Sequence, residues 1–144
     1  MRTPPLFHLA IPVTDLEDAR YFYVNTLGCS IGRFDQRWVD YDFFGHQLTT
    51  HLVENMPVGD PANDVDGKAV PVRHFGVILD WDRWHQLRDE LLDRQVDFLI
   101  EPSIRFAGEV GEQATLFVTD PSGNVLEFKS FRDLNNLFLS GMAP

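Results

Sequence analysis

The sequence has very little lysine, a single cysteine and no long hydrophobic run. Lys68 and Lys129 are the only lysines in 144 residues, and the formal net charge is −10. Nucleic acids and anionic membrane surfaces attract positive charge, so this balance argues against either as a partner. Cys29 has no second cysteine to pair with and fits a reducing compartment. Because no apolar run reaches about 18 residues and no charged-then-apolar leader opens the chain, we expect a cytoplasmic protein that neither spans a membrane nor is secreted.

A short apolar segment with a histidine at its second position occurs twice. Phe7-His8-Leu9-Ala10-Ile11-Pro12-Val13 returns as Arg73-His74-Phe75-Gly76-Val77-Ile78-Leu79. Side chains alternate between the two faces of a strand, so each histidine should point away from the hydrophobic face. The next residue on the histidine's face is small in both copies, Ala10 or Gly76. We expect this to leave room beside each imidazole.

The pattern around each copy predicts the same order of elements. Thr14 and Glu17 have the form of a capping box, and Gly28 is placed to end the helix that follows. A second helix is expected to open near 80–82. Strands are predicted at 7–13, 30–34, 37–44, 47–54, 72–79, 96–100, 114–119 and 124–130.

This repetition predicts an α+β fold of two tandem βαβββ modules that form a curved mixed sheet. The first module covers residues 1–54 and the second 72–130. Residues 55–71 are rich in Pro, Gly, Asp and Asn without an apolar period, which indicates a linker. A short amphipathic helix and a tail are expected over 131–144, and the glycine-containing segment 102–113 is a candidate lid.

Four potential metal ligands fall on the face away from the helices. Aligning 47–52 with 123–128 makes His51 equivalent to Glu127, and His8 and His74 are equivalent in the opening strands. A lone histidine on a strand is more often structural, but three with a facing carboxylate favour a metal site. Two imidazoles and one carboxylate suit Fe(II), and Zn, Ni, Co or Mn also accept such ligands. His51 is either a fourth ligand or a catalytic acid/base residue.

The two modules, their histidines and the closing run Asp120-Pro121-Ser122-Gly123-Asn124-Val125-Leu126-Glu127-Phe128 resemble the vicinal oxygen chelate superfamily. Its members include glyoxalase I, extradiol ring-cleaving dioxygenases, fosfomycin-resistance thiol transferases and bleomycin-resistance proteins. The resemblance implies that His8, His74 and Glu127 bind a divalent metal, Fe(II) by preference, and that His51 stands where glyoxalase I-like members carry a fourth ligand. It also implies a homodimer.

The likeness leaves three functions open. The segments Phe43-Phe44-Gly45-His46-Gln47 and Trp38-Val39-Asp40 resemble a small bacterial subgroup described as extradiol-type dioxygenases, which makes that oxidoreductase the first expectation for a small substrate with vicinal oxygens. However, no histidine follows His85, and Leu116-Phe117 stands where that family has Leu-Tyr. A glyoxalase I-like lyase or isomerase and a metal-free binding protein like the bleomycin-resistance members are the alternatives.

Few residues are available to hold a substrate. Phe117 is expected to contact it because of its place in the last hairpin. Glyoxalase I chemistry needs cationic groups for the glutathione carboxylates, and the candidates are Arg33, Arg37, Arg73 and Arg105. Arg105, on the expected lid, is the first of these. A solvated surface role is the ordinary alternative for each arginine.

Overall fold

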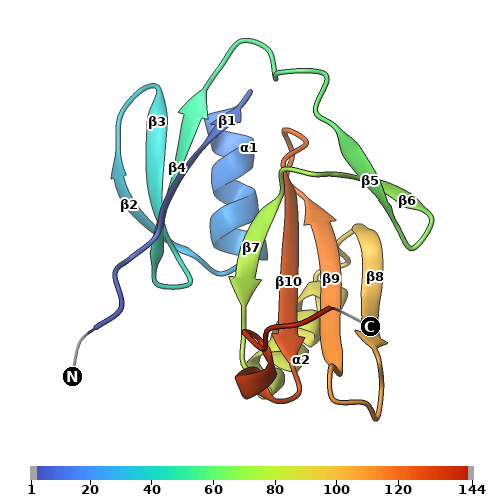
Figure 1. Ribbon diagram of the computed structural model, residues 1–144. Helices are drawn as coiled ribbons and strands as arrows, with labels where there is room; N and C mark the ends of the chain where they lie inside the picture. The colour runs from blue at the N-terminus through green and yellow to red at the C-terminus, as the bar shows by residue number, and fades with distance from the viewer. Residues whose placement is uncertain (1–2, 143–144) are drawn as a thin grey trace. The chain divides into compact units, whose positions relative to one another are not determined.

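The computed structural model describes residues 3–142 and divides the chain into two compact units (Figure 1). The first unit consists of the chain up to Gly59 together with Asp120–Asn124. The second consists of Asp60–Thr119 and the chain from Val125 onward. The α+β class with two repeated modules is confirmed. None of the helices within residues 3–142 is both long and apolar enough to cross a lipid bilayer.

A four-stranded sheet forms the first unit, in the strand order β1-β4-β3-β2. β1 is parallel to β4, and the other neighbours are antiparallel. The helix α1 continues into a π-helical segment. The elements are β1 (His8–Val13), α1 (Leu16–Arg20), the π-helical segment (Tyr21–Thr26), β2 (Ser30–Phe34), β3 (Trp38–Phe43) and β4 (His46–Leu52).

The start of α1 differs by one residue from the predicted cap. Asp15, with extended backbone angles, is the N-cap, and its carboxylate accepts a hydrogen bond from the Asp18 backbone N–H at 2.9 Å. The Thr14 backbone N–H instead donates to the Ser122 hydroxyl. The prediction of a capping box formed by Thr14 and Glu17 was therefore wrong. The helix does end at Gly28, whose φ of +81° is a conformation that favours glycine.

Apolar side chains of α1 and the π-helical segment pack on one face of the first sheet. Tyr23 is fully buried, and its ring lies 5.3 Å from that of Tyr41 and 6.4 Å from that of Phe43, centroid to centroid. Val13 and Leu48 complete this layer with at most 1% of their surface exposed. The face toward the helix is thus the hydrophobic one, as the alternation predicts.

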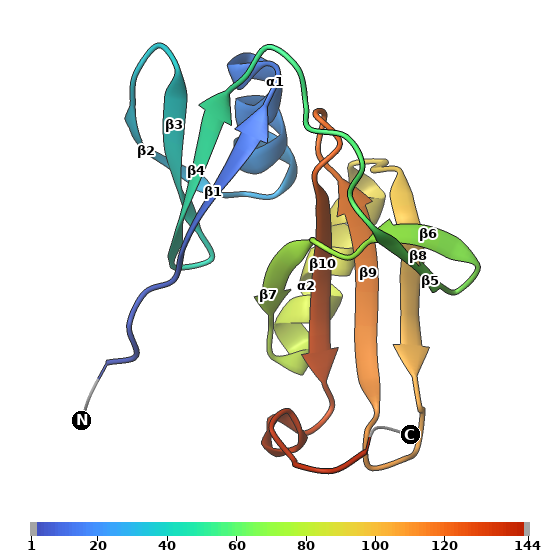
Figure 2. The ribbon, with the colours of Figure 1, turned by 45° about the horizontal axis from the view of Figure 1, so that its top comes forward.

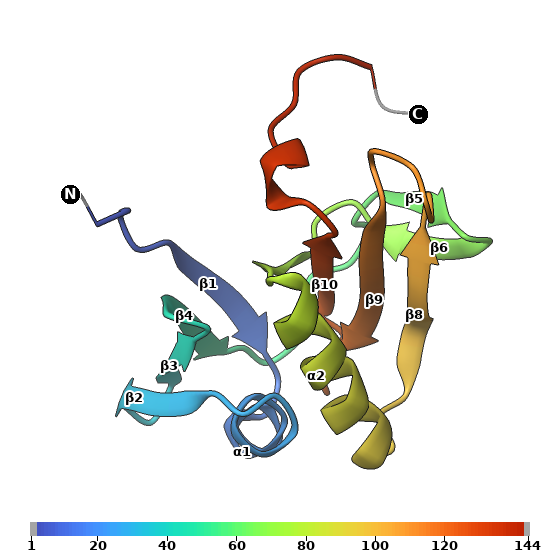
Figure 3. The same ribbon diagram turned by 90° about the horizontal axis from the view of Figure 1, so that it is seen from below.

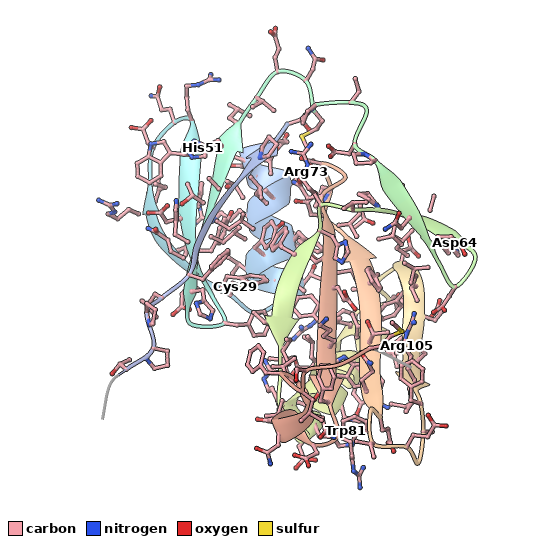
Figure 4. The ribbon with its side chains drawn as sticks, in the orientation of Figure 1. Cys29, His51, Asp64, Arg73, Trp81 and Arg105 are labelled. Atoms are coloured by element: carbon pink, nitrogen blue, oxygen red, sulfur yellow. The ribbon has the colours of Figure 1, made fainter. Side chains whose placement is uncertain are left out.

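Cys29 follows this helix (Figure 4) and is buried. Burial raises the pKa of its thiol from 9.0 to about 12, with a smaller contribution from Asp42. We expect thiol reagents at about pH 8 to modify Cys29 only as the chain unfolds, because the thiolate is the nucleophile.

The raised pKa of Cys29 also makes the unfolding free energy depend on pH. The thiol ionises in the unfolded chain before it ionises in the folded one, so its contribution to stability is complete below pH 9 and is lost toward pH 12. Urea titrations across this range should show a shallower pH dependence in Cys29→Ala, and an equal dependence would contradict the assignment.

The second unit repeats the first with one addition. Its main sheet has the order β7-β10-β9-β8, with β7 parallel to β10, and a separate two-stranded hairpin precedes it. The elements are β5 (Ala62–Val65), β6 (Lys68–Pro71), β7 (Phe75–Ile78), α2 (Trp81–Asp93), β8 (Phe98–Arg105), β9 (Gln113–Thr119), β10 (Val125–Phe131) and a 3-10 turn (Leu134–Asn136).

α2 covers one face of this sheet and the β5–β6 hairpin lies over the other (Figure 3). Asp80 caps α2 by accepting from the Arg83 backbone N–H at 2.8 Å. The Trp84 indole N–H donates to the Phe128 carbonyl at 2.9 Å, and Leu87 and Leu91 are fully buried beside it. This helix therefore buries the even-numbered face of β10 and leaves the odd-numbered face to the hairpin side.

The hairpin lies in the segment expected to be a linker. Asp66 and Gly67 both have positive φ, 50° and 79°, which is the geometry of a two-residue type I′ turn. Val70 and Val65 on its strands pack against Ile100 and Phe117 of the main sheet. Residues 60–71 thus belong to the second unit rather than to a free connection.

Two other boundaries also moved. β8 continues to Arg105, so the first part of the expected lid at 102–113 is strand. Of the helix and tail expected over 131–144, residues 143–144 lie outside the described residues; β10 runs on to Phe131, and the only helical part of the described remainder is the 3-10 turn Leu134–Asn136.

Candidate functional site

His74 and Glu127 meet on the face of the second sheet that is opposite α2. The imidazole Nε2 of His74 lies 3.2 Å from Oε1 of Glu127, and the two side chains are 27% and 19% exposed. His74 immediately precedes β7, and Glu127 is on the adjacent strand β10, where it pairs with Gly76. The alternation of side chains along two parallel neighbours brings them to the same face.

The hydrogen bonds around this pair leave two acceptors facing each other. The other ring nitrogen of His74, Nδ1, lies 2.8 Å from the Pro71 carbonyl, which can only accept, so Nδ1 carries the proton. In the neutral ring Nε2 then presents a lone pair to Oε1. A lone pair and a carboxylate oxygen at 3.2 Å require a shared proton or a cation between them. The arrangement is therefore suited to binding a positive species.

Thr115 and Phe117 on β9 hold His74 and Glu127 in their orientations. The Thr115 hydroxyl donates to Oε2 of Glu127 at 2.7 Å, which orients the carboxylate so that Oε1 faces His74. The Phe117 ring stands edge-on to the imidazole with a centroid distance of 5.4 Å. Phe117 is only 3% exposed because Val70, Ile100 and Val125 surround it. In this structure Phe117 supports the imidazole, and its contact with a substrate stays a prediction.

Gly76 is small for a different reason from the one expected. A β-carbon built on it would lie 1.6 Å from the Glu127 carbonyl oxygen and 2.6 Å from the carbonyl carbon. The space beside Gly76 is therefore filled by the backbone of β10. The glycine permits β7 and β10 to approach closely, and it does not provide room for a ligand.

His8 and His51 both lie in the first unit, at opposite ends of one strand pair. His8 is opposite Gln47, and His51 is opposite Pro12, which places the two histidines four residues apart along the strands. At about 3.3 Å per residue this separation is roughly 13 Å, and strand side chains stand nearly perpendicular to the sheet. The two imidazoles cannot share one ion. Figure 4 shows His51 toward the end of the sheet, where its side chain is exposed.

The predicted equivalence of His51 with Glu127 was wrong by two residues. Ala10 pairs with Thr49 in the first unit, as Gly76 pairs with Glu127 in the second, so Thr49 holds the equivalent position. A carboxylate does occur next to it, on β3. Asp40 accepts from the Thr49 hydroxyl at 2.6 Å and is 9% exposed.

Only part of the predicted ligand set is brought together. Within residues 3–142 no three His, Cys, Asp or Glu side chains are grouped closely enough to hold a metal ion. His74 and Glu127 form a pair in the second unit, whereas His8 begins β1 of the first. The role of His8 as a ligand stays a prediction.

The four candidate substrate-binding arginines all have partners inside the protein. Arg105 ends β8 and donates to an Asp66 carboxylate oxygen at 2.7 Å (Figure 4). Arg37 donates to the Leu52 carbonyl at 3.0 Å. Arg73 forms an ion pair with Asp60, and Arg33 lies 3.7 Å from Asp40.

The comparisons with known proteins agree with this architecture. The model of the Glyoxalase/Bleomycin resistance protein/Dioxygenase superfamily matches residues 6–128. The chain belongs to this superfamily. A glyoxalase/bleomycin resistance protein/dioxygenase from Alicyclobacillus acidocaldarius is 37% identical, with a TM-score of 0.77 over 96% of this chain and 100% of the other. Among proteins with curated descriptions, none matches.

More distant superfamily structures share the fold. A glyoxalase/dioxygenase from Nostoc punctiforme is 16% identical with a TM-score of 0.61, over 90% of this chain and 92% of the other. A glyoxalase/bleomycin resistance protein/dioxygenase from Nocardioides is 17% identical with the same TM-score, over 100% of this chain and 89% of the other. At these identities the likeness concerns the fold alone.

Sequence reasoning missed the residues that support His74 and Glu127. Thr115 is a plain strand residue, and no local pattern indicates that its hydroxyl reaches a carboxylate on the next strand. Pro71 was assigned to a linker. The Asp66-Gly67 pair is the signal that could have revealed the hairpin and, with it, a carbonyl beside His74.

Proposed function

We propose that this protein is a metal-dependent enzyme acting on a small substrate with vicinal oxygens, with extradiol-type ring cleavage as the first reaction to test. The observation that supports a metal is the convergence of His74 Nε2 and Glu127 Oε1 at 3.2 Å with the remaining ring nitrogen already bonded to Pro71. An imidazole lone pair beside a carboxylate is a donor set that divalent first-row metals accept.

The residues present fit a divalent ion, with Fe(II) favoured and Zn, Ni, Co or Mn as alternatives. His74 and Glu127 would hold it, and His8 is the third ligand by resemblance. Such an ion would act as a Lewis acid toward substrate oxygens or hold O₂ beside them. Because only two protein ligands are gathered in the second unit, positions remain for a chelating substrate.

The chain's own residues have separate tasks in this proposal. Thr115 keeps Oε2 of Glu127 occupied, so Oε1 remains directed at the imidazole. Phe117 shields one side of the His74 ring from water and limits its rotation. His51 lies too far along the strands from His8 to share an ion with it, so it is not a ligand in this proposal, and its acid/base role requires a substrate that reaches it.

Metal retention tests the central claim. His74→Ala should lower the affinity for Fe(II) or Co²⁺ at least about 100-fold, more than the loss of an outer-shell partner costs. His85→Ala is the matched control, since His85 lies on α2 of the same unit and its Nδ1 bonds to the Trp81 carbonyl. Elemental analysis and dialysis against a chelator measure the effect. Equal metal content in wild type and His74→Ala would remove His74 from the site.

A glyoxalase I-like lyase or isomerase is the second candidate, and one observation favours it. Phe117 occupies the place where extradiol enzymes carry a tyrosine, and no hydroxyl stands there to serve as acid or base. Oxygen-electrode measurements with catechols separate the two reactions, because only ring cleavage consumes O₂. Zinc or nickel without uptake would favour the lyase, and a protein that retains no metal would favour metal-free ligand binding.

A homodimer in the cytoplasm belongs to the same proposal. The dimer rests on the resemblance, and the location on the lone buried Cys29, which suits a reducing compartment.

A further inference from the structure

The β5–β6 hairpin is an addition to the repeated module. Among the described residues, the first unit has no strand pair that corresponds to it. In the second unit it lies over the sheet face opposite α2, in front of β8 and β9 in Figure 2. The hairpin therefore lies beside His74 but has no counterpart beside His8. This asymmetry indicates a role that is specific to His74.

Two contacts hold the hairpin against the main sheet, and a third closes its base. Val70 is 1% exposed within the cluster that includes Ile100, Phe117 and Val125. At the tip, Asp66 accepts from the Arg105 guanidinium at 2.7 Å. At the base, the Val72 backbone N–H donates to the Pro61 carbonyl at 2.8 Å. The position of Pro71, the last residue of β6, is therefore set by packing along the whole hairpin.

The Pro71 carbonyl decides which nitrogen of His74 carries the proton. Without it, the neutral ring would gain most by placing the proton on Nε2 and donating to Oε1 of Glu127. That tautomer would have no lone pair to offer at the point where the two side chains meet. With the carbonyl 2.8 Å from Nδ1, the proton stays on Nδ1 and Nε2 keeps its lone pair.

We propose that the β5–β6 hairpin is a positioning element that keeps His74 in the Nδ1–H tautomer through Pro71, and that Val70 is the residue that seats it. The inference rests on the proposed metal site for its functional consequence. The hydrogen bond from Nδ1 to the Pro71 carbonyl is present without a metal, and the proton on Nδ1 is open to measurement in the metal-free protein.

The test compares two buried valines of the same unit. Val70→Ala removes packing on the hairpin side of the sheet. Val118→Ala removes an equivalent side chain on the α2 side, where Val118 is fully buried and pairs with Leu126. Both variants lower stability, so a difference between them in the state of His74 reports on the hairpin and not on general loosening.

Two readouts are measured on the whole chain at about pH 8. Nitrogen-15 NMR of the His74 ring, assigned with His74→Ala, should show a proton on Nδ1 in wild type and Val118→Ala, and a population that lacks the Nδ1 proton in Val70→Ala. Titration with Co²⁺ should show affinity lowered about tenfold in Val70→Ala and less than about twofold in Val118→Ala.

The outcomes separate this inference from the metal proposal. A wild-type ring without a proton on Nδ1, or identical His74 spectra in both variants, would overturn the hairpin's role even if Co²⁺ binds. If the spectra are as expected but Co²⁺ does not bind, the result would support the positioning role and count against the metal site.

Discussion

Gly76→Ala is expected to destabilise the second unit by about 3 kcal/mol or more, at the upper end of what overpacking costs. The added β-carbon would lie 1.6 Å from the Glu127 carbonyl oxygen, which is backbone in the middle of a parallel strand pair. Neither strand can move alone, because β10 also pairs with β9. The β7–β10 ladder must open, and Glu127 must move away from His74.

Urea unfolding followed by tryptophan fluorescence measures this loss. Trp84 is buried in α2 of the second unit and packs on β10, so it reports on the affected sheet. The matched control is Ala10→Gly, at the equivalent position of the first unit, where the loss should be about 0.5–1 kcal/mol. A Gly76→Ala protein within about 1 kcal/mol of wild type would show that the two strands are not so close.

The comparison with the sequence shows why some features were predictable. Strands and helices followed from alternation and caps, which are local properties. The meeting of His74 with Glu127 followed from alternation, because His74 shares a face with Gly76 and Gly76 pairs with Glu127 in the neighbouring strand. A shift of one residue in strand register reverses the face and is therefore visible in the hydrophobic pattern.

A shift of two residues is invisible to that pattern, and this explains the error at His51. Thr49 and His51 occupy the same face of β4, so the alternation accepts either as the equivalent of Glu127. Only the hydrogen-bonded register, in which Ala10 is opposite Thr49, decides between them. The cap of α1 was misplaced for a similar reason, since Thr14 and Asp15 are adjacent and both residue types cap helices.

The sequence does not indicate which charged side chains pair when they are far apart in the chain. Arg105 and Asp66 are 39 positions apart and meet only because the hairpin crosses to β8. Arg33 and Asp40 meet through the β2–β3 pairing. Once paired, such arginines are less available for a substrate carboxylate.

The turn Asp120–Asn124, part of the family-like closing run, joins β9 to β10 but packs with the first unit. The Asp120 side chain is almost fully buried and accepts four hydrogen bonds. Its donors are the Tyr23 hydroxyl at 2.8 Å, and the backbone N–H of Ser122, the backbone N–H of Asn124 and the side-chain amide of Asn124, each at 2.9 Å. The same Asn124 amide donates to the Pro12 carbonyl at 2.8 Å, beside the end of β1.

Asp120→Ala should therefore cost about 3–5 kcal/mol of unfolding free energy in the first unit. A hydrogen bond to a charged acceptor contributes about 1.5–3 kcal/mol, and the Tyr23 hydroxyl would remain buried without a partner. The donors of Ser122 and Asn124 are only partly buried and can bond to water instead, which keeps the loss below the sum of four such bonds. Burial first, and then the neighbouring Asp120, raise the pKa of Tyr23 well above 10, so the neutral phenol is the form that the fold holds. Urea unfolding near neutral pH measures the loss without phenol ionisation.

Tyr23→Phe separates the hydroxyl from the rest of the turn. It removes one donor and leaves Asp120 with three, so the expected loss is only about 1–2 kcal/mol. In the double variant the orphaned hydroxyl is gone, and the combined loss should be smaller than the sum of the two single losses. Additive losses would mean that Tyr23 and Asp120 act independently, and the buried hydrogen bond would then not be what ties this turn to the first unit.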